Sequence, residues 1–354
     1  MERLAALTMT LLMVAVSITS SLNVRNPPYE GQKYLIITID TEAQSPRQSN
    51  DHVQRLIYGN FSDGRAGILE MMDEADQAGV QLTFFVDVLE DTLYPREIRE
   101  VLRTIHARGH DIQLHQHAYL IPDETWNDWQ SDPHWHHHEA DPLHKIDCWD
   151  EETADFVFEQ MISVLEEENI PLPVASRGGS YAYNQAILNA MSKHNITTSF
   201  NYEPQLRKDY FNEGTQPMFK WSNGIVEVPV TYIPVPWTLS GLDRLDDTLW
   251  SSWFLNRHFD SFFDASNGDT VAVMIFHSWS FLELVEHKDG EYFEYSNDKK
   301  VKQFSKFLEN IPDDVEVITA ADLADKISDG EFEISTDYDV AEASNHCKNP
   351  NNVV

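Results

Sequence analysis

Cysteine is scarce in this sequence: Cys148 and Cys347 are the only two among 354 residues. Two cysteines cannot form the framework of several disulfides that stabilises small secreted domains. A single disulfide between them and two unpaired thiols are both compatible with the sequence. Since 42% of the residues are hydrophobic and they are spread along the chain, a sizeable core can form.

Basic residues are also few. The chain has 25 Lys and Arg residues against 59 Asp and Glu residues, which gives a formal net charge of -34. This imbalance argues against binding to the phosphate backbone of nucleic acids and against docking on an anionic membrane. It favours a neutral or cationic substrate, although an acidic surface can also serve solubility alone.

Apolar runs of membrane length are absent. The run Leu4–Val16 follows Arg3 and precedes the small polar stretch SITSS at residues 17–21. This is the pattern of a signal peptide, and the run is too short for a comfortable membrane span. We therefore expect residues 1–21 to be removed from a secreted or periplasmic protein with no stable membrane span. An uncleaved N-terminal anchor is the alternative.

Eight short apolar runs read as strands, with helical patterns between them. They are Tyr34–Ile39, Gln81–Val86, Asp111–His115, Val174–Ser176, Thr197–Phe200, Ile225–Val230, Val271–Phe276 and Val315–Ile318. Alternating strands and helices imply a parallel sheet with right-handed crossovers. The sequence thus predicts an α/β protein, a distorted TIM-type (β/α) barrel of about seven or eight parallel strands over residues 32–328. The polar, acidic residues 329–354 are predicted to form a flexible tail.

Pairs of polar side chains end two of these runs. Asp40 and Glu42 follow the first run, and His115 and His117 end the third. In extended backbone, residues i and i+2 project to the same side, so each pair shares one face. One carboxylate can bind a metal while the other accepts a proton, and neutral imidazoles are common ligands of zinc-like ions. Because the C-terminal strand ends of a barrel form its active face, we expect the four side chains to converge on one cation.

The segment SRGGSY ends the fourth run and brings Arg177 to the same face. Arg177 can orient a carboxylate such as Asp40. Adjacent glycines let the backbone approach a ligand closely, and the amides of Gly179, Ser180 and Tyr181 can bind an oxyanion. An ordinary strand-to-helix turn is the alternative reading of this segment.

His277 ends the seventh run, after six consecutive apolar residues typical of a buried parallel strand. Its imidazole is suited to donate a proton to a leaving group near neutral pH. Trp279 is a candidate for the substrate groove, with core packing as the alternative. The stretch 119–149 is rich in tryptophan and histidine; it is expected to overhang the active face, as a packed lid or as a surface for sugars or a second metal.

The order of these segments resembles the NodB-homology polysaccharide deacetylases, carbohydrate esterase family four. ITIDTE is similar to the first motif of that family, GHDIQLHQH to its histidine motif, SRGGSY to its arginine motif and FHSW to its late histidine motif. The resemblance covers roughly residues 32–328. Two departures stand out: Thr41 separates the two acids, and Tyr119 occupies the usual position of the second histidine. An acid-x-acid motif with an HxH pair is more similar to a divergent branch associated with lipopolysaccharide biosynthesis.

The resemblance implies metal-dependent removal of an acetyl group, more often N-acetyl than O-acetyl, from a glycan or polysaccharide. It implies Glu42, His115 and His117 as ligands of a divalent ion, zinc or else cobalt, nickel or manganese. Asp40 would then be the catalytic base. A non-catalytic sugar-binding module on the same scaffold and a hydrolase of another non-peptide C–N bond remain alternatives. The sequence predicts no oligomeric state.

Overall fold

The computed structural model describes residues 31–43, 52–118, 121–131, 145–203, 217–234, 242–244, 262–263, 270–288, 290–334 and 337–343. The predicted signal peptide, residues 1–21, lies outside these ranges. Among the described residues, no helix combines the length and apolar composition needed to cross a membrane.

Within the described ranges, ten strands form the central sheet, and all eight predicted strands belong to it. In spatial order they are β12 (Thr270–His277), β1 (Lys33–Thr41), β4 (Thr83–Asp87), β5 (Asp111–Gln116), β6 (Ala175–Gly178), β7 (Thr198–Ser199), β9 (Val226–Glu227), β8 (Phe219–Trp221) and β16 (Asp337–Tyr338), with β15 (Val315–Val317) beside β1. Among the described residues, the pairing of β8 with β9 is antiparallel and the other pairings in this sheet are parallel.

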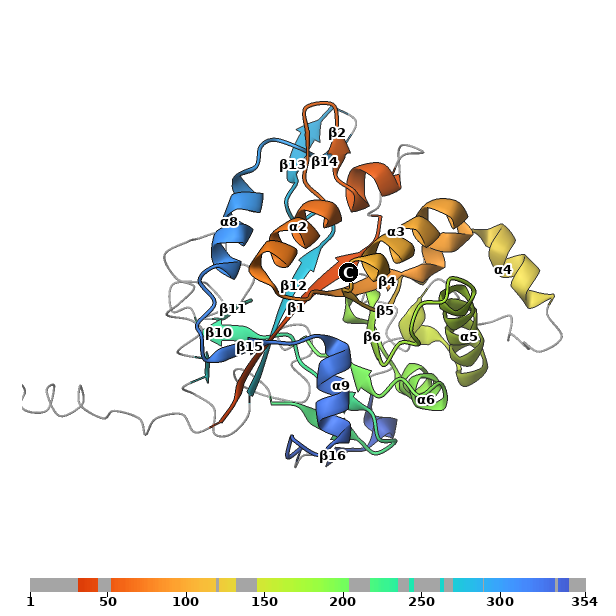
Figure 1. Ribbon diagram of the computed structural model, residues 1–354. Coiled ribbons are helices and arrows are strands. Elements are labelled where there is room, and N and C mark those ends of the chain that lie inside the picture. The colour runs from red at the N-terminus through yellow and green to blue at the C-terminus, as the bar shows by residue number, and fades with distance from the viewer. Residues whose placement is uncertain are drawn as a thin grey trace, which may run out of the picture.

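The sheet curls into a half-barrel. The segment after β9 approaches β12, where the Thr231 amide donates to the Val273 carbonyl at 3.2 Å and the Val273 amide donates to the Thr231 hydroxyl at 2.8 Å. Helices cover the sheet, as Figure 1 shows. They are α2 (Ile68–Ala78), α3 (Pro95–Ala107), α4 (Asp123–Gln130), α5 (Glu151–Glu167), α6 (Gln185–Lys193), α8 (Lys299–Leu308) and α9 (Ala320–Ser328). The predicted distorted (β/α) barrel is therefore confirmed.

Short elements complete the described fold. The two-stranded sheets are β2 (Asn60–Phe61) with β3 (Gly64–Arg65), β10 (Tyr232–Pro234) with β11 (Leu242–Arg244), and β13 (Glu283–His287) with β14 (Gly290–Glu294). The short helical turns are η1 (Val53–Ile57), η2 (Val88–Thr92), η4 (Ile146–Cys148), η5 (Gly179–Tyr181) and η7 (Val340–Glu342).

The alternation of side chains along β1 divides the core in two. Leu35, Ile37 and Ile39 pack in the larger cluster, together with apolar side chains of the outer helices. Tyr34 and Ile36 point the other way, into a smaller cluster built from several strands and α9. Because side chains of a strand alternate between faces, Thr38, Asp40 and Glu42 share the inner face with Tyr34 and Ile36.

The predicted tail is wrong in part. Within residues 329–354, β16 pairs with β8, and Val340 and Ala343 pack in the larger core cluster. A few apolar residues in a polar segment are enough to dock it, which a composition argument misses. Cys148 is disulfide-bonded, and Cys347, the only other cysteine, lies outside the described residues.

Glu227 on β9 gives a prediction for stability. It is fully buried, and burial raises its pKa to about 7 because the hydrogen bonds it accepts offset only part of the desolvation. The unfolded chain releases this proton near its ordinary pKa, so the folded state holds more protons between about pH 4.5 and about 7. The stabilisation from the protonated Glu227 is fully present below about pH 4.5. About 3 kcal/mol of unfolding free energy is lost as the pH rises from there through about 7.

The measurement is chemical denaturation of the wild type and of Glu227→Gln across this pH window. The unfolding free energy of the wild type, relative to that of Glu227→Gln, should fall as the pH rises and then level off. If the difference in unfolding free energy between the wild type and Glu227→Gln stays constant over this pH window, Glu227 remains charged in the folded protein.

Candidate metal centre

Two carboxylates lie at the end of β1, on its inner face. Asp40 and Glu42 are 4% and 6% exposed, so both are removed from bulk water. Asp40 is in register with His277 of β12, which brings the first and seventh predicted strand ends together. The site therefore begins where the apolar inner face of β1 gives way to acidic residues.

Two imidazoles reach the same place from β5. His115 Nε2 lies 3.4 Å from Glu42 Oε2, and His117 Nε2 is in direct contact with the same oxygen. One ligand atom from each of Glu42, His115 and His117 lies within 4.8 Å of the others, and all three residues are buried. Asp40 is not a member of this group. The predicted convergence of two strand ends is thus present.

The donor set fits a divalent metal. The Nδ1 atom of His115 donates to the Arg177 carbonyl at 2.7 Å, which directs the Nε2 atom at Glu42. His115 Nε2 is buried and makes no hydrogen bond. Fixing the outer ring nitrogen on a carbonyl is the usual way to orient a histidine ligand. A tetrahedral ion with bonds of about 2 Å separates its donors by about 3.3 Å, close to the spacing of His115 and Glu42.

Opposite charges offset the burial of these groups. Burial favours the neutral form of Glu42, but the imidazoles of His117 and His115 outweigh it and hold the pKa of this carboxyl well below its usual value. Burial likewise opposes the charging of His115, but the carboxylates of Asp40 and Glu42 raise its pKa to about 9. Glu42 is therefore an ionised oxygen donor between two imidazoles.

Arg177 holds Asp40. Its guanidinium donates to Asp40 Oδ1 at 2.6 Å and to the Thr38 hydroxyl at 3.0 Å, and it lies 4.3 Å from the centre of the Phe85 ring. Burial tends to raise the pKa of Asp40, but the neighbouring guanidinium and imidazoles lower it overall. The contact expected between Arg177 and Asp40 is present, and Asp40 is an ionised carboxylate beside the donor set.

The turn after β6 packs closely against His117. A Cβ atom on Gly179 would lie 2.2 Å from Cε1 and Nδ1 of His117, so only glycine fits there. Ser180 and Tyr181 follow with φ of 53° and 55°, the left-handed region that residues with a side chain rarely adopt. The predicted oxyanion segment therefore lies next to a predicted metal ligand.

Replacing Gly179 with alanine tests this contact. The added methyl group must displace the His117 ring, so Gly179→Ala is expected to weaken metal binding by about 10- to 100-fold. The measurement is isothermal titration with zinc. Gly224→Ala is the matched control, because its φ of +95° strains a side chain but a Cβ there meets nothing within 4 Å. Equal zinc affinity of Gly179→Ala and the wild type would contradict the packing described.

His277 faces Glu42 from β12. Its Nε2 atom lies 3.9 Å from Glu42 Oε1, and its side chain is 33% exposed, the most accessible of the predicted site residues on the strands. Trp279 stacks on the His277 ring, with centroids 4.7 Å apart and planes at 26°. Since Trp279 is 6% exposed, it supports His277 from behind and offers little surface to a sugar. The core-packing alternative describes Trp279 better than the groove does.

Part of the tryptophan-rich segment is packed. Trp126 and Trp149 are each 2% exposed, and Trp129 stacks edge-on between Trp126 and Phe156. These three side chains agree with a packed lid. Tyr119, Trp135 and the histidines of 134–144 lie outside the described residues.

Asp87 is a site residue that the sequence analysis missed. It ends β4 in register with His115, lies fully buried on the inner face, and its Oδ2 atom has no hydrogen bond. Burial, together with the nearby Glu90 carboxylate, raises the pKa of Asp87 to about 8. The signal was available: Asp87 follows the apolar run QLTFFV directly, as Asp40 follows YLIITI.

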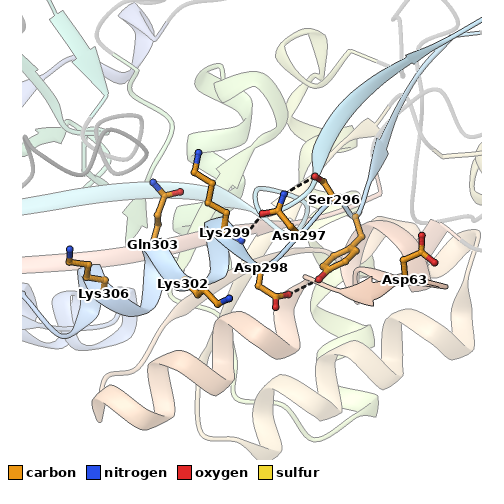
Figure 2. Close-up of a pocket in the computed structure, with 9 residues that line it drawn as sticks. Asp63, Ser296, Asn297, Asp298, Lys299, Lys302, Gln303 and Lys306 are labelled. Carbon is orange, nitrogen blue, oxygen red and sulfur yellow. Dashed lines mark hydrogen bonds between the residues drawn. The ribbon is translucent and has the colours of Figure 1, made fainter.

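An open pocket of about 710 Å³ lies elsewhere, along α8 and near Asp63. Figure 2 shows Lys299, Lys302 and Lys306 projecting from this helix, with Asp298 bonded to a neighbouring tyrosine. No predicted site residue lines this pocket. The metal donor set and this lysine-lined pocket are therefore separate features of the described structure.

Comparison with known proteins identifies the fold. No family model matches this chain, and no curated protein does. Among solved structures, a Mycobacterium smegmatis protein provisionally named a polysaccharide deacetylase superposes with a TM-score of 0.50 at 17% identity, over 87% of this chain and 95% of its own. The alpha-amylase AmyC from Thermotoga maritima gives 0.53 at 10% identity, over 88% of this chain and 77% of its own. A GH57-type branching enzyme from Pyrococcus horikoshii superposes with a TM-score of 0.50 at 11% identity, over 87% of this chain and 72% of its own. The chain therefore has the distorted β/α-barrel fold of these proteins.

Proposed function

We propose that this protein is a metal-dependent deacetylase that removes acetyl groups, chiefly N-acetyl groups, from a glycan or polysaccharide. The observation that carries the proposal is the buried donor set of Glu42, His115 and His117, with the Asp40–Arg177 pair beside it. Three protein donors leave room for water and substrate on the ion, as catalytic sites require. The fold shared with a provisionally named polysaccharide deacetylase agrees with this activity.

The residues divide the chemistry between them. Bound zinc, or cobalt, nickel or manganese in its place, would polarise the acetyl carbonyl and lower the pKa of water. Asp40, held ionised by Arg177, takes a proton from the water that attacks the acetyl carbon. Amide groups of the turn at Gly179–Tyr181 face the oxyanion that forms. His277 gives a proton to the amine as the C–N bond breaks, which yields acetate and a free amino sugar.

The net charge and the disulfide bond bear on the substrate and on the cellular compartment of the protein. A net charge of -34 favours a neutral glycan, or one that becomes cationic as its amines are exposed. The disulfide at Cys148 suits an oxidising compartment, in agreement with the expected signal peptide. We therefore propose that the protein works outside the cytoplasm, secreted or periplasmic.

The test combines metal analysis with product detection. The purified protein should contain one divalent ion per chain and release acetate from N-acetylglucosamine oligomers. O-acetylated xylan and a cyclic amide are the comparison substrates, because they separate an N-deacetylase from an esterase and from a hydrolase of other C–N bonds. Oligomer binding without acetate release would instead indicate a sugar-binding module.

A further inference from the structure

The turn at Gly178–Tyr181 is held in a costly conformation. Two successive residues with side chains, Ser180 and Tyr181, have positive φ. Residues with a side chain rarely adopt this conformation, and it persists only where the surroundings hold it. The turn also contacts His117 through Gly179. A contact with another part of the fold must therefore hold Gly178, the first residue of this turn, in place.

Asn201 makes that contact. This residue follows β7 and is fully buried. Its Oδ1 atom accepts from the Gly178 amide at 2.6 Å, and its Nδ2 group donates to the Ser199 hydroxyl at 2.9 Å. Both ends of the side-chain amide are thus occupied, so its orientation is fixed. The short bond to Gly178 ties the beginning of the turn to the neighbouring strand.

Glu227 in turn fixes the backbone of Asn201. Its Oε1 atom accepts from the amides of Asn201 at 2.7 Å and Tyr202 at 2.8 Å, and its Oε2 atom accepts from the Trp221 indole at 3.2 Å. The Ser199 side chain is a fourth hydrogen-bond partner of this carboxyl, and a fully buried carboxyl with four such partners is costly to place and geometrically specific. The chain of contacts therefore runs from β9 through Asn201 to the turn that borders the donor set.

We propose that Asn201, anchored by Glu227, is a positioning residue that holds the Gly178–Tyr181 turn in its strained shape against His117. The expected effect of Asn201 on kcat rests on the proposed function, whereas its effect on the conformation of the turn does not. Asn201 contacts neither the metal donors nor Asp40 by any described hydrogen bond, so it acts through the turn alone.

The test compares Asn201 with Gln113, whose buried side-chain amides accept hydrogen bonds from the backbone at opposite ends of β6. Gln113 Oε1 accepts from the amides of Val174 and Ala175, just as Asn201 accepts from Gly178. Each of Asn201→Ala and Gln113→Ala removes a buried side-chain acceptor from this strand. Two readouts are used: hydrogen exchange of the Gly178 amide in the metal-free protein, and kcat and KM for acetate release at saturating zinc.

Asn201→Ala should speed exchange at Gly178 by about 10-fold or more and lower kcat by about 10- to 100-fold, with KM nearly unchanged. Gln113→Ala should leave both readouts close to wild type. Asn201→Asp keeps an acceptor for the Gly178 amide and should restore exchange protection and most of kcat, which a merely destabilised fold would not show.

Unchanged exchange at Gly178 in Asn201→Ala, or equal effects of Gln113→Ala, would overturn the inference. A wild type that releases no acetate from any substrate would refute the proposed function instead. The exchange measurement would still decide whether Asn201 holds the turn, so the two failures are distinguishable.

Discussion

The double variant His115→Ala/His117→Ala is expected to retain no stoichiometric metal and to release no acetate. It removes two of the three donors, and a single carboxylate holds a zinc-like ion poorly against water. Metal content after dialysis, measured by plasma mass spectrometry, and acetate release check the two results. Circular dichroism is needed as well, because Glu42 then loses its two nearest basic partners in a buried position and keeps only His277.

His110→Ala is the control for this experiment. His110 is a buried histidine at the start of the same strand, where its Nδ1 atom accepts from the Leu82 amide. It lies at the opposite end of β5 from the donor set, so its loss should leave the metal content unchanged. One metal ion per chain in the double variant would rule out the donor set described here.

Asp40→Asn is expected to keep the metal and lose turnover by about 10²- to 10⁴-fold, the usual contribution of a general base. The metal remains because Asp40 is not part of the three-residue donor group. The activity falls because an amide cannot take up the proton, although it can still accept a hydrogen bond from Arg177. The measurement is kcat at saturating zinc, alongside metal analysis.

Asp111→Asn is the matched control for this loss. Asp111 is a half-buried acid at the start of β5, where it accepts hydrogen bonds from the Thr83 hydroxyl and the Ala321 amide at the far end of the sheet. Its replacement should change stability and leave kcat close to wild type. Turnover preserved in Asp40→Asn would require a different base, and Asp87 would be the next candidate.

Local sequence patterns were sufficient for most of the fold. Buried parallel strands are apolar on both faces, so runs such as YLIITI and VAVMIF identify β1 and β12 without any tertiary information. Helix α3 also has a local signal, because Pro95 begins it and Ile98, Val101, Leu102 and Ile105 recur at helical spacing. Short strands such as β16 have no such signal, since their pairing depends on a partner far away in the sequence.

The site was predictable only where a strand end marked it. Glu42, His115 and Arg177 all follow apolar runs, and a parallel sheet brings such ends together. The roles of Asn201 and Glu227 could not be predicted, because they depend on contacts between segments that are distant along the chain. The positive φ of Ser180 was likewise hidden, since serine is not a residue that signals this conformation.

The alternation of side chains along β1 has a consequence for how this protein can change over time. Its two faces serve different purposes: one carries the aliphatic side chains that pack under the helices, and the other carries the inner cluster and then the acids. Deleting or inserting one residue within Lys33–Ile39 would exchange these faces. The carboxylates would then turn into the apolar layer, and isoleucine side chains would take their place on the inner face beside His115 and His117. Point substitutions on either face can be accepted separately, but a change in the length of this strand would damage folding and chemistry in a single event.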